Sequence, residues 1–460
     1  MKAGFALLAF CVSASAMAAD EHLSTLSDRK QVSVTIYNDN LALVKEEREI
    51  RLDKGLNRIA WRDVSAEIHP ETALFHAKGE AIKLLEQNFD FDLLTPESLL
   101  QKYVGKQVEI IRTNAATGAE TREKATVLSA TNGVVLKYAD RIETGLPGRL
   151  AFNAVPENLR DRPTLVVSLE SPGAGMRDVE LDYLTGGLGW RADYVAELDA
   201  ADDRMDLNGW VTLTNTSGTS YRDATLQLVA GEVNRVRDQM KVYASRAMPA
   251  APAMVSESLL DYHLYTLDRP TDIEDRQTKQ VALLSAGGIP VKKEYVLQGG
   301  DCYAGQSCET GKKRKVAVNL SFENRGGDLG IALPAGIIRV YKKDRAGHPQ
   351  FVGEDRIDHT PKYAKVTLKL GDAFDVTAER TRTSYSSISK NEHESAWRIV
   401  LRNAKSEAVE VKVEETLPGD WKILTENLHH EKTSSSTAEW QVLVPAEGSA
   451  TLEYRARVKF

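Results

Sequence analysis

The sequence predicts an all-β, multi-domain protein that consists of β-sandwich modules with a small inserted β-barrel. Apolar and polar residues alternate with a period of two, which is typical of half-buried strands, at residues 32–36, 164–169, 364–370 and 409–413. Gly, Pro, Asn and Asp separate these segments, as turn residues do. A helix start is indicated at Thr95-Pro96, an N-cap residue followed by proline at the first helical position, and we expect about two helical turns there.

The N-terminal residues 1–19 have the pattern of a signal peptide. Lys2 is followed by an apolar run at residues 3–12 and by a small-residue cleavage site at residues 16–18. The apolar run is too short for a membrane-spanning helix, which needs about 20 residues. We therefore expect an exported protein, periplasmic or secreted after cleavage, with no transmembrane helix.

Four domains are predicted to follow the signal peptide. The Asn132-Gly133 pair is a strong hairpin signal in the second of them. Residues 244–258 lack any periodic face, so we expect a flexible loop there, either an inert excursion or a segment whose methionines engage a partner. The domains are an N-terminal β-domain (20–95), a small β-barrel-like domain (96–155), a first β-sandwich module (156–300) and a C-terminal β-sandwich module (301–460).

Two cysteines remain once the signal peptide is removed, Cys302 and Cys308. In an oxidising compartment a pair this close is expected to form a disulfide, here at the tip of a predicted hairpin. A loop this short contributes about 2 kcal/mol of stability in the chain-entropy model. A redox centre is expected as C-x-x-C, and a zinc site would need two further ligands, so the structural interpretation is favoured.

Composition narrows the class of function. The chain has 460 residues, of which 42% are hydrophobic and 27% charged, as in globular proteins, and this excludes disordered, collagen-like and purely coiled-coil chains. The 66 acidic residues outnumber the 59 basic ones and give a formal net charge of -7. The densest basic cluster is the short run at residues 312–315, so binding to nucleic acid is not expected.

Two collinear motifs carry a family resemblance. Residues 183–194 (YLTGGLGWRADY) and 207–218 (LNGWVTLTNTSG) resemble domain-of-unknown-function family 4139, found in mucoidy-inhibitor-like proteins, and the similarity continues through residues 277–281, 371–376 and 417–421. The resemblance implies a β-rich envelope or secreted protein of unassigned biochemistry, without catalytic residues that can be carried over. Longer members have a coiled coil where this chain has its predicted small barrel, so a role in exopolysaccharide production does not transfer directly.

Catalytic and metal-binding motifs are missing from the sequence. It contains no H-E-x-x-H, G-x-S-x-G, P-loop or EF-hand pattern, so we expect no cofactor and no metal, and we predict no catalytic residue. His429-His430 followed by Glu431 could begin a metal site, but neighbouring residues on a strand point to opposite faces. A solvated hairpin is the expectation there.

The side of the strand on which each tryptophan is expected indicates a candidate binding face. Five of the six tryptophans are in phase with apolar neighbours and are expected in the core, namely Trp61, Trp190, Trp397, Trp421 and Trp440. Trp210 instead shares its side of the strand with Thr212, and Gln227 is expected beside it on a partner strand. Arg191 and Asp193 lie on the charged face of another strand. These five side chains are candidate binding residues, although burial of Trp210 against the N-terminal strands is favoured over a binding face, because large aromatic side chains are seldom left exposed.

Three functional hypotheses follow. The first is a non-catalytic exported protein that binds an envelope protein or polysaccharide. The sequence does not determine its oligomeric state. The second is a hydrolase that acts on envelope polysaccharide or peptide through carboxylates from different strands. The third, an outer-membrane-associated β protein, rests on the alternation of residues 452–460 up to the terminal Phe460, which a sandwich edge strand explains equally well.

Overall fold

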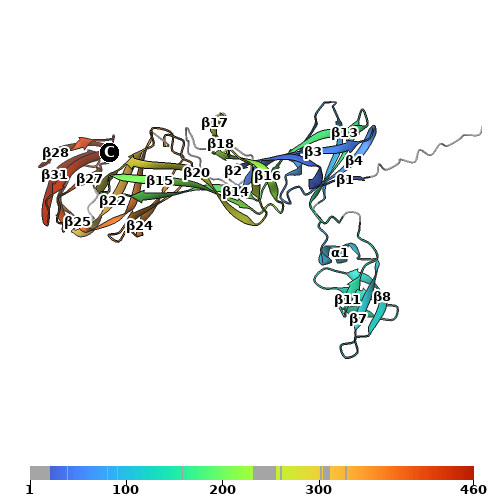
Figure 1. Ribbon diagram of the computed structural model, residues 1–460. Coiled ribbons are helices and arrows are strands. Elements are labelled where there is room, and N and C mark those ends of the chain that lie inside the picture. Colours follow the sequence, from blue (N-terminus) through green and yellow to red (C-terminus); the bar gives the residue numbers. More distant parts are fainter. Residues whose placement is uncertain are drawn as a thin grey trace, which may run out of the picture. The chain divides into compact units, whose positions relative to one another are not determined.

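The computed structural model describes residues 21–38, 40–79, 81–90, 92–156, 159–231, 255–259, 262–300, 303, 311–326 and 329–460 (Figure 1). Strands dominate these residues, which confirms the predicted all-β class. The proposed signal peptide, Cys302, Cys308 and residues 244–254 lie outside them. No helix of the described chain is both long and apolar enough to span a bilayer.

The chain divides into two compact units that alternate along the sequence. The first unit contains the chain up to Gly189 together with Thr214–Gln227 and Arg269–Gln277. The second contains Trp190–Leu213, Leu228–Asp268 and Thr278–Phe460. Each unit is described by itself below.

Two packed sheets form the body of the first unit. Residues of both sheets meet in one core, where the Phe75 ring lies 5.1 Å from the Trp61 ring and the Arg48 guanidinium lies 4.5 Å from it. The first sheet has the order β1-β4-β12-β6, with β1 Glu21–Ser24, β4 Gly55–Arg62, β12 Thr164–Ser171 and β6 Lys83–Asp90. In the second, β16-β2-β3-β13-β5 are neighbours and β19 pairs with β16, with β2 Arg29–Tyr37, β3 Leu41–Leu52, β13 Gly175–Thr185, β5 Leu74–Ala77, β16 Tyr221–Ala230 and β19 Thr271–Ile273.

A smaller sheet is inserted between β6 and β12. It follows helix α1 (Pro96–Lys102), which begins as predicted: the Thr95 hydroxyl accepts a hydrogen bond from the Ser98 N–H, and Pro96 occupies the first turn. Asn132 and Gly133 both take positive φ in the β8–β9 turn. The strand order is β10-β9-β8-β7-β11, with β7 Gln107–Thr113, β8 Glu120–Ser129, β9 Val135–Lys137, β10 Ile142–Thr144 and β11 Arg149–Ala151.

This inserted domain is an open sheet and differs from the barrel that the sequence predicts. Its end strands β10 and β11 each have three residues, and the pairing of the described residues ends at them. Closure of a barrel requires the two end strands to pair, and β10 and β11 do not pair with each other among the described residues. The core of this domain includes Leu100 of α1 together with Val108, Ile110, Val127 and Leu136 of the strands.

A five-stranded sheet opens the second unit, in the order β20-β15-β14-β23-β24. β14 and β23 run parallel, from the Ala192–Gly336 pair onward. The sheet therefore joins strands from both sides of residue 300, where the sequence suggests a boundary between two modules. Parallel partners need a long connection, so local patterns do not reveal them. The bounds are β14 Leu188–Leu198, β15 Arg204–Asn215, β20 Gln277–Pro290, β23 Gly336–Lys343 and β24 Pro349–Ile357.

A short hairpin in the second unit is formed by β17 (Val255–Leu259) and β18 (Tyr262–Thr266), which pair antiparallel. Residues 255–258 belong to the segment that the sequence predicts as a flexible loop. The structure has them in strand β17, and the remainder of that segment lies outside the described residues.

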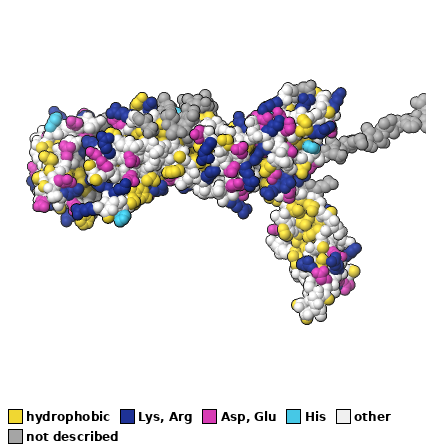
Figure 2. Space-filling view, in the orientation of Figure 1, with side chains coloured by type: hydrophobic (Ala, Val, Ile, Leu, Met, Phe, Trp, Pro, Cys, Tyr) yellow, Lys and Arg dark blue, Asp and Glu magenta, His cyan; other side chains and the backbone are white. Residues whose placement is uncertain are grey.

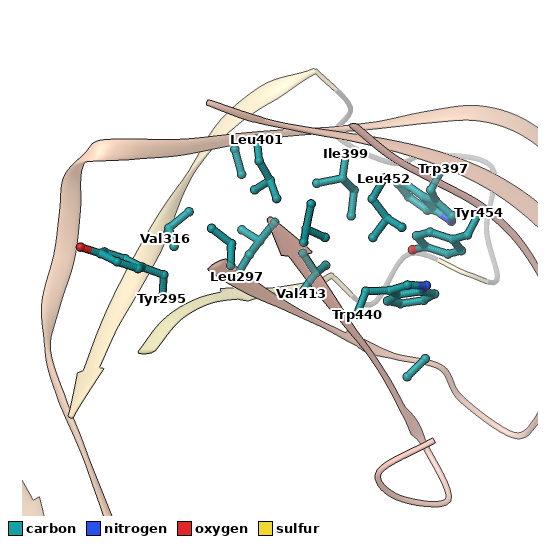
Figure 3. Close-up of a cluster of buried hydrophobic side chains, with 14 of the residues drawn as sticks. Tyr295, Leu297, Val316, Trp397, Ile399, Leu401, Val413, Trp440, Leu452 and Tyr454 are labelled. Atoms are coloured by element: carbon teal, nitrogen blue, oxygen red, sulfur yellow. The ribbon is translucent and has the colours of Figure 1, made fainter. Parts of the chain in front are cut away.

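The C-terminal part of the second unit is one nine-stranded sheet that folds over itself. Its order is β28-β31-β26-β25-β22-β21-β27-β30-β29, and β30 comes back against β26 and β31. Figure 3 shows the enclosed core, in which Val413 and Trp440 face Ile399 and Leu452. The bounds are β21 Lys292–Gln298, β22 Lys312–Glu323, β25 Lys365–Ser389, β26 Glu392–Asn403, β27 Val409–Thr416, β28 Asp420–Glu426, β29 Glu431–Lys432, β30 Thr437–Val444 and β31 Gly448–Lys459.

A buried ion pair lies inside this C-terminal core. Arg380 is 3% exposed and Glu415 fully buried, and the two form a bidentate pair with N–O distances of 2.7 and 3.0 Å. The Tyr303 hydroxyl donates to Glu415 at 2.8 Å, and the Arg380 guanidinium lies 3.3 Å from the centre of the Trp397 ring. Tyr303, which lies between the two cysteines in sequence, is thus anchored in the core.

Candidate functional site

The outer face of the five-stranded sheet carries the exposed tryptophan. All six tryptophans are described, and the five that the sequence assigns to the core are at most 7% exposed. Trp210 of β15 is 41% exposed, because its strand buries the alternate residues Val211 and Leu213 instead. Val195 of β14, at 37% exposed, is a further apolar residue of the outer face. Single exposed apolar side chains are common on protein surfaces, so the case for a site depends on the polar groups that lie on the same face.

Asp193 of β14 is the centre of the polar groups on this face. Its Oδ2 accepts a hydrogen bond from the Thr212 hydroxyl at 2.8 Å and from Arg191 Nε at 3.0 Å. Its Oδ1 accepts from Arg339 Nη1, also at 3.0 Å. Asp193 is 8% exposed, which places its carboxylate just under the surface. The three donors hold the carboxylate in a fixed position there.

The charge state of Asp193 follows from these contacts. Burial raises the pKa of the carboxyl group, but the hydrogen bonds from Thr212 and Arg339 and the charges of Arg191 and Arg339 outweigh it, so that the pKa lies below the usual value for aspartate. The same hydrogen bond raises the pKa of Arg339. Asp193 is therefore an ionised acceptor at neutral pH.

The polar contacts extend across all five strands. Gln280 Nε2 of β20 donates to the Thr212 hydroxyl of β15 at 3.1 Å, and Arg339 Nε of β23 lies 3.2 Å from a Glu354 oxygen of β24. With Asp193 between them, one side chain of each strand joins a continuous row. We call the outer surface that contains Trp210, Val195, Arg191 and this row the Trp210 face. Its row consists of Gln280, Thr212, Asp193, Arg339 and Glu354.

Four of the five candidate binding residues thus come together, and three further ones were missed. Trp210, Thr212, Arg191 and Asp193 share the Trp210 face, and the side chain of Arg191 is 64% exposed. Local sequence pattern gives no signal for Gln280, Arg339 or Glu354. Their strands join the sheet from far along the chain, one of them through the parallel β14–β23 ladder.

Gln227 is not part of the Trp210 face. The sequence predicts β15 and β16 as paired strands, but β15 lies between β14 and β20, whereas β16 lies beside β2 in another sheet. The side-chain amide oxygen of Gln227, Oε1, accepts a hydrogen bond from the Thr35 hydroxyl of β2 at 3.0 Å. β15 ends at Asn215, and in the turn that follows the side-chain amide of Asn215 donates a hydrogen bond to the Thr219 carbonyl at 2.9 Å.

The histidine pair is arranged differently from the predicted solvated hairpin. Residues 427–430 lie between β28 and β29 and are not part of a strand, so the alternation of faces does not apply to them. The Nδ1 atoms of His429 and His430 both lie within hydrogen-bond distance of the Glu426 carboxylate.

A depression among the described residues of the second unit lies away from the Trp210 face. It has a volume of about 970 Å³, and its lining includes Lys292, Phe322, Arg325 and Tyr363 but none of the candidate binding residues. Depressions suit small ligands, whereas an open sheet surface suits an extended one. On the side of the molecule that Figure 2 shows, positive and negative side chains are interspersed, without a dominant sign.

The fold and this face define an all-β protein with a polar and aromatic sheet surface. A family model described as "Domain of unknown function (DUF4139)" matches residues 179–460, more than half of the chain. The protein therefore belongs to this family, and the resemblance carried by the glycine-tryptophan motifs is confirmed. The whole polar row and Trp210 lie within the matched region. No curated protein matches the chain.

Proposed function

We propose that this protein is an exported, non-catalytic binding protein of the cell envelope, and that its Trp210 face binds an envelope polysaccharide. The observation that carries the proposal is the exposed Trp210 on the same face as a fixed row of charged and amide side chains. A sugar ring has an apolar C–H face and a rim of hydroxyl groups. The indole can pack against the first, while Asp193, Arg191 and Gln280 offer acceptors and donors to the second.

Preorganisation supports this function. The side chains of the row hold one another in place through the contacts between Gln280, Thr212, Asp193, Arg339 and Glu354. A ligand then orders few additional rotamers when it binds, which reduces the entropic cost of association. An open sheet surface also fits a long polymer better than a small molecule.

The electrostatics of Asp193 favour binding over hydrolysis at this face. A glycosidase needs one carboxylic acid with a raised pKa that protonates the leaving group. The pKa of Asp193 is lowered by its three donors, although burial acts in the opposite direction. A carboxylate of this kind is a fixed acceptor and a poor general acid.

Export and the disulfide are part of the same proposal. The signal-peptide pattern at residues 1–19 supports a periplasmic or secreted location, where Cys302 and Cys308 would be oxidised. The anchoring of Tyr303 in the core is compatible with a closed loop around it. Intact-mass measurement of the secreted chain, with and without thiol alkylation, tests both the cleavage after residue 19 and the disulfide.

The decisive experiment for the binding function is a screen of the purified mature protein against an array of envelope glycans. The variants are Trp210→Ala and, as a matched control, Phe374→Ala, which removes an aromatic ring that is 95% exposed on β25. We expect selective binding by wild type and by Phe374→Ala, and loss of at least about 2 kcal/mol in Trp210→Ala, as for tryptophans at the centre of an interface.

Two outcomes would contradict the proposal. Absence of binding to any envelope glycan would remove the polysaccharide as the ligand, and equal binding by Trp210→Ala would move the site elsewhere. Release of reducing sugar ends during the incubation would instead support the hydrolase hypothesis, and it is measured in the same samples.

A further inference from the structure

Three potential metal ligands converge at the end of β28. Glu426 is the last residue of this strand, and the following turn brings two imidazole rings back to it. His429 Nδ1 lies 3.1 Å from one oxygen of Glu426, and His430 Nδ1 lies 2.9 Å from the other. One ligand atom from each of the three residues lies within 4.8 Å of the other two.

These spacings match the edges of a metal coordination sphere. Ligand atoms bound at about 2.0 to 2.1 Å, with angles between those of an octahedron and a tetrahedron, lie about 2.9 to 3.4 Å apart. Both N–O distances fall in this range. In the neutral tautomer with the hydrogen on Nε2, each imidazole presents an Nδ1 lone pair on the side of the carboxylate. A bound metal ion would then replace the two Nδ1–H hydrogen bonds of the other tautomer.

Surrounding groups hold two of the three ligands in place. Trp440 Nε1 donates a hydrogen bond to Glu426 Oε2 at 3.0 Å, which orients the carboxylate as outer-shell donors do in metal sites. The His430 side chain is 20% exposed, and its ring lies 5.8 and 5.7 Å from the rings of Trp421 and Trp440. The His429 side chain is 87% exposed, so an ion can enter from solvent on that side.

We propose that Glu426, His429 and His430 form a binding site for a divalent transition-metal ion, for which Zn²⁺ is the best-fitting probe. Two imidazoles and one carboxylate are ligands that zinc accepts, and three protein ligands leave one tetrahedral position for water. Calcium and magnesium are disfavoured because they prefer oxygen ligands. The site is separate from the Trp210 face and does not depend on the function proposed for that face.

The test is a calorimetric titration of the untagged, chelator-treated mature protein with ZnCl₂. We expect one ion per chain in wild type and affinity at least about tenfold weaker in His429→Ala, as for the loss of a group that supports a metal. This substitution removes an exposed ring and is expected to leave the fold intact. The matched control is His348→Ala, whose side chain is 75% exposed and lies 3.8 Å from Asp344, without a third ligand among the described residues.

A second readout uses the two neighbouring indoles. Cu²⁺ bound at His430 is expected to quench the fluorescence of Trp421 and Trp440, and His429→Ala should shift this quenching to higher Cu²⁺ concentration. The proposal is overturned if wild type binds Zn²⁺ no more tightly than His429→Ala does. It is overturned equally if His348→Ala loses as much affinity, since the binding would then come from scattered surface histidines.

Discussion

Two arginine–carboxylate groups of the second unit use the same chemistry in opposite environments. In the C-terminal core, Glu415 and Arg380 are almost completely buried and pair in bidentate geometry, with Tyr303 as a further donor. On the Trp210 face, Asp193 is also held by arginines, but the side chains of Arg191 and Arg339 are 64% and 34% exposed.

The difference in exposure distinguishes a structural pair from one that is accessible to a ligand. A buried ion pair must satisfy its hydrogen bonds internally, because an unpaired charge in the core is very costly. An exposed guanidinium can exchange water for a ligand at little cost. An arginine–carboxylate pair therefore stabilises one sheet from the inside, and in the proposed function a second such pair contributes to a binding surface on another sheet.

The largest expected effect comes from breaking the buried pair. Glu415→Ala leaves the Arg380 charge without its partner and should lower the free energy of unfolding by about 3–5 kcal/mol, measured by urea denaturation. The control is Arg398→Ala, which breaks an ion pair with Glu453 whose side chains are 55% and 51% exposed. That loss should stay below about 1 kcal/mol. Equal losses in the two variants would show that Arg380 and Glu415 are not a buried pair.

The next effect is on binding rather than stability. Trp210→Ala should weaken polysaccharide binding by at least about 2 kcal/mol, roughly 30-fold, because the central aromatic contact is lost. Its free energy of unfolding should fall by about 1–2 kcal/mol, less than the roughly 3–5 kcal/mol typical of a fully buried tryptophan, because the indole is partly exposed. A large loss of stability in this variant would instead place Trp210 in a packed interface.

Asp193→Asn should show an intermediate effect with a defined pH dependence. The pKa of Asp193 is lowered in the folded protein, so its stabilisation is present above the unfolded pKa of about 3.9 and disappears as the pH falls through the lower, folded pKa. In urea denaturation, wild type should be more stable than the variant by about 1 kcal/mol at pH 7 and at pH 5. This value allows for the solvent exposure of the arginines, which weakens their interaction with Asp193. The difference should shrink at pH 3; a difference that grows there would contradict the lowered pKa.

The smallest effect is expected for Gln227→Ala. Gln227 belongs to a different sheet and accepts a hydrogen bond from Thr35, so its loss should leave polysaccharide binding unchanged. The free energy of unfolding should fall by about 1 kcal/mol at most, the usual contribution of one hydrogen bond. Weakened binding in a folded variant would return Gln227 to the binding face.

Some of these features could be predicted from the sequence because they depend on local periodicity. The all-β class, the helix start at Thr95 and the position of Trp210 on the face of its strand opposite to Val211 and Leu213 all follow from residues within one segment. The exposure of Trp210 does not follow in this way, because the sequence favours its burial against other strands. The sequence also contains a local signal for the buried pair. Arg380 lies on the same side of its strand as the buried residues Val376 and Ala378, and Glu415 lies on the same side of its strand as Val413.

Other features depend on which strands become neighbours, and local pattern does not determine that. Arg339 reaches Asp193 through a parallel ladder whose strands lie more than a hundred residues apart, and Gln227 was assigned to the wrong neighbour for the same reason. The alternation of faces along a strand does not apply to the histidine pair, because residues 427–430 form the connection between β28 and β29.

The measurement that tests the central claim most directly is acrylamide quenching of intrinsic fluorescence, with and without envelope polysaccharide. In the free protein, Trp210 should supply the readily quenched fraction, which the Trp210→Phe variant lacks, because the other five tryptophans are at most 7% exposed. The account predicts that polysaccharide shields this fraction in wild type. A polysaccharide that binds while Trp210 remains fully quenchable would contradict it.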